Sequence, residues 1–453
     1  MTDSNKSSHG EWSSRMAFIL AATGSAVGLG NIWKFPYITG ENGGGAFVIV
    51  YLMCVLLIGI PIMIAETMIG RRGKRNPIGT MALLAKESDA DPNWHYLGWL
   101  GVVAGFLILS YYSVIAGWGL SYILNVFTGS FSGAGGEKVQ TIFNDFMASP
   151  LQQLFWHTVF MVVTMSVVAR GVTEGLERAV QWLMPALFFL LLLLVAYAMS
   201  TNSYFKGLNF LFNTDFSKIT GQSVLTAMGH AFFTLSLGMG AIMVYGAYLP
   251  KDISIARTTV IVAGADTLVA LLAGMAIFPI VFENNLQPGS GPGLIFQTLP
   301  IAFGNMTGGW FFGILFFVLL VFAALSSSIS LIEPAVAWLV ETRNMTRQRA
   351  CVWAGAVTWL LGLGTIFSFN IWSEFKIFDR TIFELLDYLT ANLMLPIGGF
   401  CIAIFAGWVM KQEHCKKELH LTNPHYFEVW RFLVCYVSPA AVFLVFLNVV
   451  GVI

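Results

Sequence analysis

Apolar residues run through most of the chain in segments of roughly twenty, separated by short polar stretches. A helix of this length crosses the hydrocarbon core of a bilayer. The pattern predicts eleven spans, at residues 16–37, 44–69, 96–127, 153–169, 179–199, 223–248, 256–282, 309–340, 350–367, 383–410 and 430–452. We therefore expect an all-α polytopic membrane protein with eleven transmembrane helices.

Two of these segments are interrupted near their middle by glycine and hydroxyl residues. The first contains Gly24 to Asn31, and the sixth contains Phe233 to Gly240. Glycine costs about 1 kcal/mol against alanine in a helix interior, and irregular backbone survives in a membrane only where protein or water covers it. Gly24 and Gly28 alone would equally suit close helix packing. Two breaks at matching places favour broken helices around a transport site.

Spans one and six lie five apart, and five is odd, so a second set of five spans would be inverted relative to the first. This reasoning divides the chain into four parts. They are a cytoplasmic tail at 1–14, a first inverted repeat at 15–200 (spans one to five), a second at 201–412 (spans six to ten), and span eleven within 413–453.

Composition and charge agree with a membrane protein. Hydrophobic residues make up 57% of the chain and charged residues 11%, against roughly 25% charged in soluble domains. The net charge is zero, which argues against a nucleic-acid partner. A cytoplasmic N-terminus places 18 of the 24 Lys and Arg residues on the cytoplasmic side, as the positive-inside rule requires. Eleven spans then put the C-terminus outside.

Two loops are expected on the outer side. The glycine- and serine-rich segment from Gly129 to Pro150 is predicted to be one of them. The segment from Glu283 to Met306 contains an apolar run, Leu294 to Phe303. Because a run this apolar needs cover, we expect it to fold back as a short helix.

The residues around the breaks resemble the neurotransmitter:sodium symporter family, in its bacterial, leucine-transporter-like branch. The motifs that carry the resemblance are Gly24–Pro36, Glu41–Phe47, Phe232–Gly238 and Ala323–Ser328. The matches extend from about Trp12 to Trp408. The resemblance implies sodium-coupled symport by alternating access in the bacterial cell membrane, and no enzymatic activity.

The resemblance also implies an amino acid as substrate. Helix ends at a break offer N–H groups to an anion and carbonyls to a cation. Monoamine transporters have an aspartate where Gly28 stands, so here the substrate must bring its own carboxylate. The implied substrate-binding residues are Ala26, Gly28, Leu29, Gly30, Ile108, Tyr112, Phe233, Thr234, Ser236, Met239, Ser327 and Leu331. None is charged, which implies a hydrophobic L-amino acid such as tryptophan, leucine or phenylalanine. For the apolar members, core packing is the alternative.

Two sodium sites follow from the same resemblance. The first would use Ala26, Asn31, Thr234 and Asp266, together with the substrate carboxylate. The second would use Gly24, Val27, Ala323, Ser326 and Ser327. The alternative for the serines is a hydrogen bond back to their own helix, which is common in membrane helices.

Asp266 is an ionisable residue in the middle of span seven, where such residues are costly and usually functional. The family often has asparagine at this position, and its chloride-dependent members place a chloride ion nearby. A carboxylate supplies that negative charge permanently, so we expect transport without chloride. The alternative is a buried acid satisfied by hydroxyl groups.

The resemblance implies gates on both sides of the site. Lys34 and Asp387 would pair as the outer gate, where the family usually has arginine in place of Lys34. Tyr112 and Phe233 would form a lid beneath them. The inner gate would use Trp12, Tyr248 and Glu341. Glu66 in span two would accept hydrogen bonds from freed N–H groups of the breaks, whereas Glu333 has no assigned role.

Two other classes of membrane protein are less compatible with the sequence. An enzyme needs a convergent acid–base or metal cluster, and the intramembrane charges of this chain are few and scattered. An ion channel needs rings of pore-lining groups from an oligomer.

Overall fold

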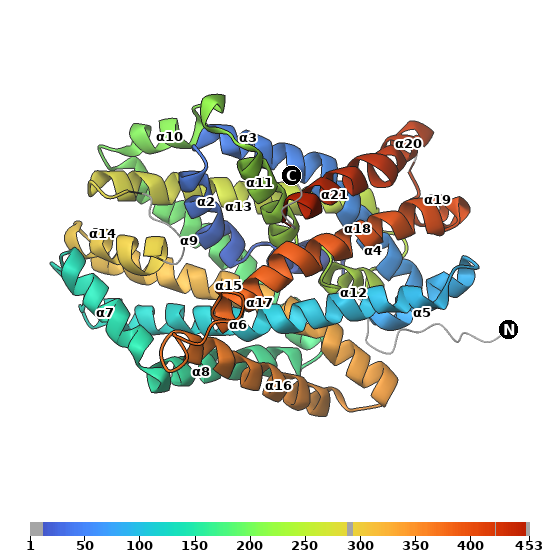
Figure 1. Ribbon diagram of the computed structural model, residues 1–453, viewed down its shortest axis with the longest axis horizontal. Helices are drawn as coiled ribbons and strands as arrows, with labels where there is room; N and C mark the ends of the chain where they lie inside the picture. Colours follow the sequence, from blue (N-terminus) through green and yellow to red (C-terminus); the bar gives the residue numbers. More distant parts are fainter. Residues whose placement is uncertain (1–11, 288–292, 422, 450–453) are drawn as a thin grey trace.

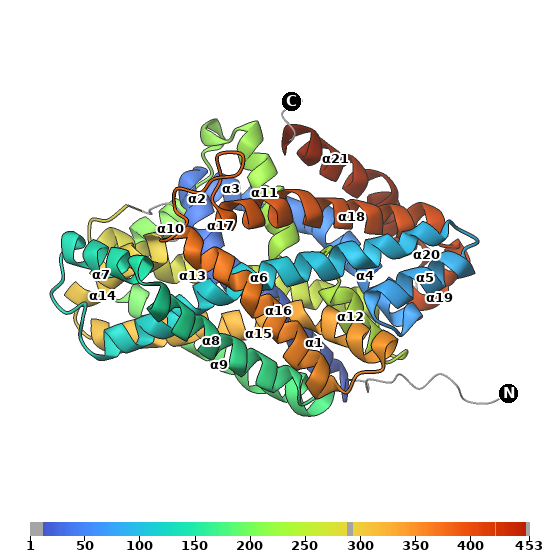
Figure 2. The same ribbon diagram turned by 60° about the horizontal axis from the view of Figure 1, so that its bottom comes forward.

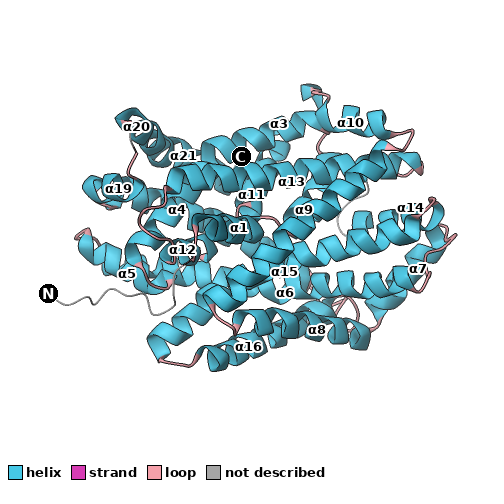
Figure 3. Cartoon of the chain, turned by 180° about the vertical axis from the view of Figure 1, so that it is seen from behind, coloured by secondary structure: helices cyan, strands magenta, loops and turns pink. Residues whose placement is uncertain are grey.

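The computed structural model describes residues 12–287, 293–421 and 423–449. These residues form helices and connecting loops (Figure 3). The one β-type contact among them is an isolated bridge between Ile377 and Arg380. The all-α prediction is therefore confirmed. Most of the predicted tail, residues 1–11, lies outside the described residues.

Nine helices in the described chain are long and apolar enough to cross a membrane. Several consist of two labelled parts joined by wider helical turns. The nine are α3 with α4 (Gly45–Cys54 and Ile60–Gly73), α6 (His95–Phe127), α8 (Pro150–Val168), α9 (Arg178–Met199), α13 (Ile255–Glu283), α15 (Gly309–Arg343), α16 (Arg347–Ser368), α17 with α18 (Ile382–Asp387 and Leu395–Ile404), and α20 with α21 (Pro424–Phe432 and Ser438–Val449).

The first and sixth predicted spans are divided. Helices α1 (Arg15–Ala26) and α2 (Phe35–Glu41) are joined through Gly30–Lys34 with a bend of 48°, and together they form a tenth candidate span. Helices α11 (Gly221–Thr234) and α12 (Ala241–Ala247) occupy the sixth segment and are each shorter than a span. Every predicted segment thus contains helix, and both predicted breaks are present.

The backbone between α11 and α12 shows why the sixth segment breaks. Ser236, Gly238 and Gly240 have φ angles of 55°, 77° and 76°, in the left-handed region. Side chains with a Cβ avoid that region, and glycine enters it at little cost. The two glycines therefore permit a tight turn where a regular helix would otherwise continue.

Shorter helices lie at the two ends of the molecule. In Figure 1, α7 (Gly136–Ala148), α10 (Tyr204–Phe212) and α14 (Leu299–Asn305) lie at one end, and α5 (Pro77–Glu87) and α19 (Gln412–Leu419) lie at the other. Helix α7 lies within the predicted loop at 129–150. The amphipathic stretch after Gly135 has helical periodicity, which the glycines before it obscured. The apolar run at 294–303 is buried and ends in α14, as predicted.

Helices α6 and α15 pack along each other through the middle of the molecule, and α8 and α16 cover α6 (Figure 2). Glycines on α6 make the approach close. A Cβ at Gly105 would lie 2.8 Å from the Leu331 carbonyl oxygen, and one at Gly101 would lie 3.0 Å from the Gly240 nitrogen. These close approaches place α6 directly against α15 and against the break between α11 and α12.

Candidate functional site

The two breaks meet in the interior. The Ser236 hydroxyl, between α11 and α12, donates a 2.8 Å hydrogen bond to the carbonyl of Ser25 near the end of α1. The Gly238 N–H donates to Glu66 Oε2 on α4 at 3.1 Å, so Glu66 accepts from a freed backbone group as predicted. Both breaks are therefore held in a fixed relation by side chains that satisfy buried backbone groups.

A small cavity lies between the breaks, α6 and α15. Its volume is about 20 Å³, which is room for roughly one water molecule. The lining residues are Ser25, Ala26, Gly28, Leu29, Gly30, Ile108, Tyr112, Phe233, Ser236, Met239, Ser327 and Leu331. Every predicted substrate-binding residue except Thr234 lines this cavity, and Ser25 lines it without having been predicted.

One wall of the cavity presents the N–H groups of the first break. The Leu29 N–H donates to Tyr112 Oη at 3.2 Å. A Cβ at Gly28 would lie 2.9 Å from that same Oη and still closer to the Ser327 hydroxyl. Glycine at position 28 therefore leaves space beside donors that suit a carboxylate.

A buried polar cluster, which we call the Asp266 cluster, joins Asn31, Thr234 and Asp266. The Asn31 amide donates to Asp266 Oδ1 at 2.7 Å, and the Thr234 hydroxyl lies 3.0 and 3.1 Å from the two carboxylate oxygens. Tyr51 Oη donates to Oδ2 at 3.4 Å. Asp266 is fully buried, and an ionised carboxylate in such a region of low dielectric attracts a cation strongly.

The second predicted ion site is a set of neutral oxygens, which we call the serine cluster. Ser327 Oγ lies 3.4 Å from the Gly24 carbonyl oxygen and 3.2 Å from that of Val27. Ser326 Oγ lies 3.0 Å from the Ala323 carbonyl and 3.5 Å from that of Val27. Ser326 thus bonds back within α15 and also faces α1, whereas the Ser327 hydroxyl bonds to carbonyls of the first break alone.

Neither cluster resembles a transition-metal site. No group of three or more His, Cys, Asp or Glu side chains in the described chain could hold a metal ion. Hydroxyl, carbonyl, amide and carboxylate oxygens suit hard cations such as sodium.

The Trp12 end of the site is closed by several layers. Trp12 Nε1 donates to the Tyr245 carbonyl at 3.0 Å, and its ring contacts those of Tyr245 and Tyr248 edge-on. Tyr248 Oη donates to Glu333 Oε1 at 2.9 Å. Arg347 binds both Glu333 oxygens, at 3.0 and 2.5 Å. Glu333, without a role from the sequence, is therefore part of a buried ion pair behind Tyr248.

Glu341 forms a further contact at the Trp12 end of the site. Its carboxylate accepts from the Asn76 N–H at 2.9 Å and from the Asn76 amide at 2.6 Å, so it joins α15 to the turn before α5. Ser13 bonds to Glu177 through both its N–H and its hydroxyl. The start of α1 is thus tied to the segment before α9.

The opposite end is closed by fewer contacts. The Lys34 ammonium lies 4.7 Å from the centre of the Phe233 ring. Among the described side chains, Lys34 and Asp387 form no ion pair within 4.0 Å, unlike the pairing that the resemblance implies. Tyr112 is buried and Phe233 is partly exposed. The ring of Phe233 and its cation–π contact therefore cover this side.

A sequence profile of the sodium:neurotransmitter symporter family matches residues 9–138 and 147–453. An uncharacterized sodium-dependent transporter of Bacillus subtilis, YhdH, is 38% identical over 98% of each chain. One from Haemophilus influenzae is 36% identical over 99% of each chain. The crystal structure of MhsT in complex with L-phenylalanine is similar with a TM-score of 0.90 and 44% identity, covering 97% of this chain and 99% of that one.

Proposed function

The chain belongs to the sodium:neurotransmitter symporter family, and we propose that it takes up hydrophobic and aromatic L-amino acids, independently of chloride. As a member of that family it is a multi-pass, sodium-coupled membrane transporter rather than an enzyme. One observation supports this class of substrate: an uncharged cavity lies beside backbone N–H donors at a helix break. Such an arrangement suits a molecule with one carboxylate and one apolar side chain.

Gly28 supports an amino acid over a monoamine. An aspartate at this position would supply the carboxylate that a monoamine lacks, but any Cβ here would meet Tyr112 and Ser327. The substrate carboxylate would instead lie near the N–H groups of Leu29 and Gly30. The L-phenylalanine bound to MhsT supports this assignment by similarity.

The apolar lining supports a hydrophobic side chain. Ile108, Met239 and Leu331 are all buried, and the flexible thioether of Met239 adapts to different shapes. The cavity of about 20 Å³ must widen to admit such a substrate, so side chains such as Phe233 must move. Tryptophan, phenylalanine and leucine are the expected substrates.

Two sodium ions are proposed, one in each oxygen cluster. The Asp266 cluster, with the Ala26 carbonyl, would share its ion with the substrate carboxylate. The serine cluster would hold the other ion between α1 and α15. Two sodium ions with a neutral amino acid carry two charges inward, for which the membrane potential supplies about 4.6 kcal/mol per 100 mV.

Chloride independence rests on Asp266. Its buried carboxylate, bonded to Asn31 and Thr234, balances one sodium charge without an anion from solution. Asp266→Asn keeps the size and removes the charge. We expect chloride to leave wild-type uptake unchanged and to restore part of the uptake lost in Asp266→Asn, measured with chloride or gluconate as the anion. Wild-type uptake that ceases in gluconate would contradict the proposal.

The proposed setting is a bacterial plasma membrane with a cytoplasmic N-terminus and an extracellular C-terminus. This orientation places 18 of the 24 Lys and Arg residues on the cytoplasmic side, in agreement with the positive-inside rule. Residues 15–200 and 201–412 are proposed as the inverted repeats. Trp12, Tyr248 and Glu341 would then belong to the inner gate, and Lys34 and Asp387 would pair above Phe233 only when the outer side closes further.

The test is uptake of labelled phenylalanine, tryptophan and leucine into proteoliposomes of the purified protein. An inward sodium gradient should drive accumulation above the external concentration, and a potassium gradient should not. Charged amino acids and monoamines should fail to compete. Accumulation without sodium, or competition by a monoamine as strong as by phenylalanine, would refute the proposed substrate and coupling.

A further inference from the structure

An apolar groove on the surface of the molecule, separate from the central cavity, lies between α6, α15 and α16. Its volume is about 560 Å³. The groove is lined by Trp99, Val102, Val103, Phe106, Leu107, Ala335, Trp338, Leu339, Met345, Trp353, Ala354, Val357 and Leu361. Apart from the indole N–H groups of the tryptophans, the lining side chains are apolar, so the groove is suited to hydrocarbon.

Three tryptophans place this groove at the boundary of the bilayer. The rings of Trp99 and Trp338 lie 4.9 Å apart, edge to face, and Trp353 is 63% exposed. Tryptophan is enriched where hydrocarbon meets the headgroups, because its ring is apolar and its N–H is polar. Met345, in the turn between α15 and α16, closes the end of the groove.

An exposed positive charge lies at that end. The Arg343 guanidinium, in the last turn of α15, is 5.4 Å from the centre of the Trp338 ring. In the described chain Arg343 has no carboxylate within 4.0 Å, whereas nearby Arg347 is held by Glu333. The charge of Arg343 is therefore offered to the membrane surface beside the groove.

We propose that this groove is a binding site for a phospholipid with an anionic headgroup. One acyl chain lies along the tryptophans, and the phosphate lies against Arg343. Exposed apolar surface is ordinary on a lipid-facing helix and would not by itself specify a lipid. The guanidinium supplies the specificity, because basic pockets between membrane helices select anionic headgroups.

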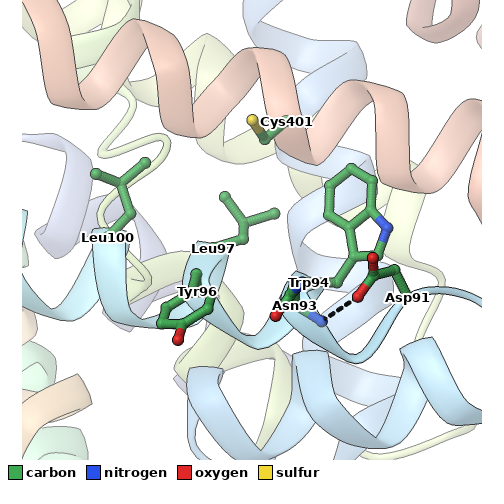
Figure 4. Close-up of a pocket in the computed structure, with 7 residues that line it drawn as sticks. All are labelled: Asp91, Asn93, Trp94, Tyr96, Leu97, Leu100 and Cys401. Atoms are coloured by element: carbon green, nitrogen blue, oxygen red, sulfur yellow. Dashed lines mark hydrogen bonds between the residues drawn. The ribbon is translucent and has the colours of Figure 1, made fainter.

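A second surface groove in the same protein provides the contrast. It has about 520 Å³ and lies between the start of α6 and α18, lined by Asp91, Asn93, Trp94, Tyr96, Leu97, Leu100 and Cys401 (Figure 4). Asp91 is its one charged lining residue, and this carboxylate accepts from the Asn93 N–H at 2.8 Å. The two grooves are similar in size, but the first has the Arg343 guanidinium beside it and the second has a carboxylate in its lining, so only the first should favour an anionic headgroup.

The position of the groove suggests what the lipid does. Ala335 and Leu339 follow Glu333 on α15, and Ala354 lies two turns after Arg347 on α16. A lipid in the groove would therefore contact both helices that carry the buried Glu333–Arg347 pair. By holding these two helices together, the lipid would stabilise the ion pair, which joins Tyr248 to α16.

The test is lipid binding to the full-length protein in detergent, read by native mass spectrometry and by thermal stability. Phosphatidylglycerol and phosphatidylcholine of the same chain length are added to wild type, Arg343→Gln and Val357→Trp. We expect wild type to retain phosphatidylglycerol preferentially. Arg343→Gln should bind it about fivefold more weakly, and Val357→Trp should lose it because the indole fills the groove.

Matched controls are Arg257→Gln and Val260→Trp on α13. Arg257 is exposed, as Arg343 is, and Val260 is 52% exposed against 43% for Val357, so the controls match the test variants in exposure. Inorganic phosphate and soluble glycerophosphoglycerol should not stabilise the protein. Stabilisation by inorganic phosphate alone, equal retention of both lipids, or unchanged binding by Arg343→Gln would overturn the proposal. The proposal would also be overturned if Val357→Trp abolished a dimer of the protein and still retained the lipid.

Discussion

The Asp266 cluster and the serine cluster both join the first break to a long helix, but only one of them carries a charge. Asp266 brings a carboxylate bonded to Asn31 and Thr234. The serine cluster contains only hydroxyls and backbone carbonyls. A buried carboxylate attracts a cation far more strongly than neutral dipoles do. The serine cluster is thus the weaker and more easily opened of the two.

Gly28 lies between the clusters. Its N–H donates to Asn31 Oδ1 at 3.0 Å, and its missing Cβ leaves room for Ser327 and Tyr112. A change at this position disturbs both clusters through the backbone and the cavity. The comparison therefore predicts a ranked series of effects, largest for Asp266 and smallest for Ser326.

The largest effect is expected from Asp266→Ala. An ion pair at about 4 Å in a partly shielded site is worth about 4 kcal/mol, so sodium affinity should fall roughly 10³-fold and uptake should be lost. Isothermal titration with sodium measures the loss, and Thr259→Ala, at a buried threonine two turns earlier on α13, is the control. Sodium affinity within tenfold of wild type would show that Asp266 is a structural acid.

Gly28→Ala should have the next largest effect. Overpacking a well-filled interior costs roughly 1–3 kcal/mol, and here the strain falls on Tyr112 and Ser327. We expect amino acid binding to weaken by about 30-fold, measured by scintillation proximity with labelled phenylalanine. Gly229→Ala on α11, where an added Cβ meets nothing within 4 Å, is the control for the lost backbone freedom. Unchanged binding would place the carboxylate site elsewhere.

Ser327→Ala should lower sodium affinity about tenfold, because one neutral oxygen ligand is worth roughly 1–2 kcal/mol. Ser328→Ala is the matched control, since the Ser328 hydroxyl faces Thr164 on α8 at 3.0 Å. The readout is the sodium concentration that gives half-maximal binding of labelled substrate. An equal effect from both variants would indicate altered helix packing instead of ion binding.

Ser326→Ala should have the smallest effect, about twofold on sodium affinity. Its hydroxyl already bonds to the Phe322 and Ala323 carbonyls of its own helix. The hydroxyl is therefore less available to a sodium ion, and both carbonyls still belong to α15 when it is removed. The same assay applies. A loss larger than that of Ser327→Ala would reverse the ranking within the serine cluster.

Much of the fold was predictable because its signals are local. Apolar runs of membrane length gave all eleven segments, and glycines beside hydroxyl residues located both breaks. The cavity residues came from motifs that resemble a known family, and all but Thr234 lie around one space. Thr234 instead turns its hydroxyl to Asp266, which the resemblance places with it in the first sodium site.

The sequence by itself determined where helices run, where they break and which residue types gather at the breaks, because these depend on neighbouring residues and on the bilayer. Only the tertiary structure decided which distant partners meet. It paired Glu333 with Arg347 behind Tyr248, and it seated Lys34 over Phe233 instead of against Asp387. It also brought the Ser25 carbonyl to Ser236. Such pairings join separate helices, so they follow from how the helices pack, which no single segment encodes.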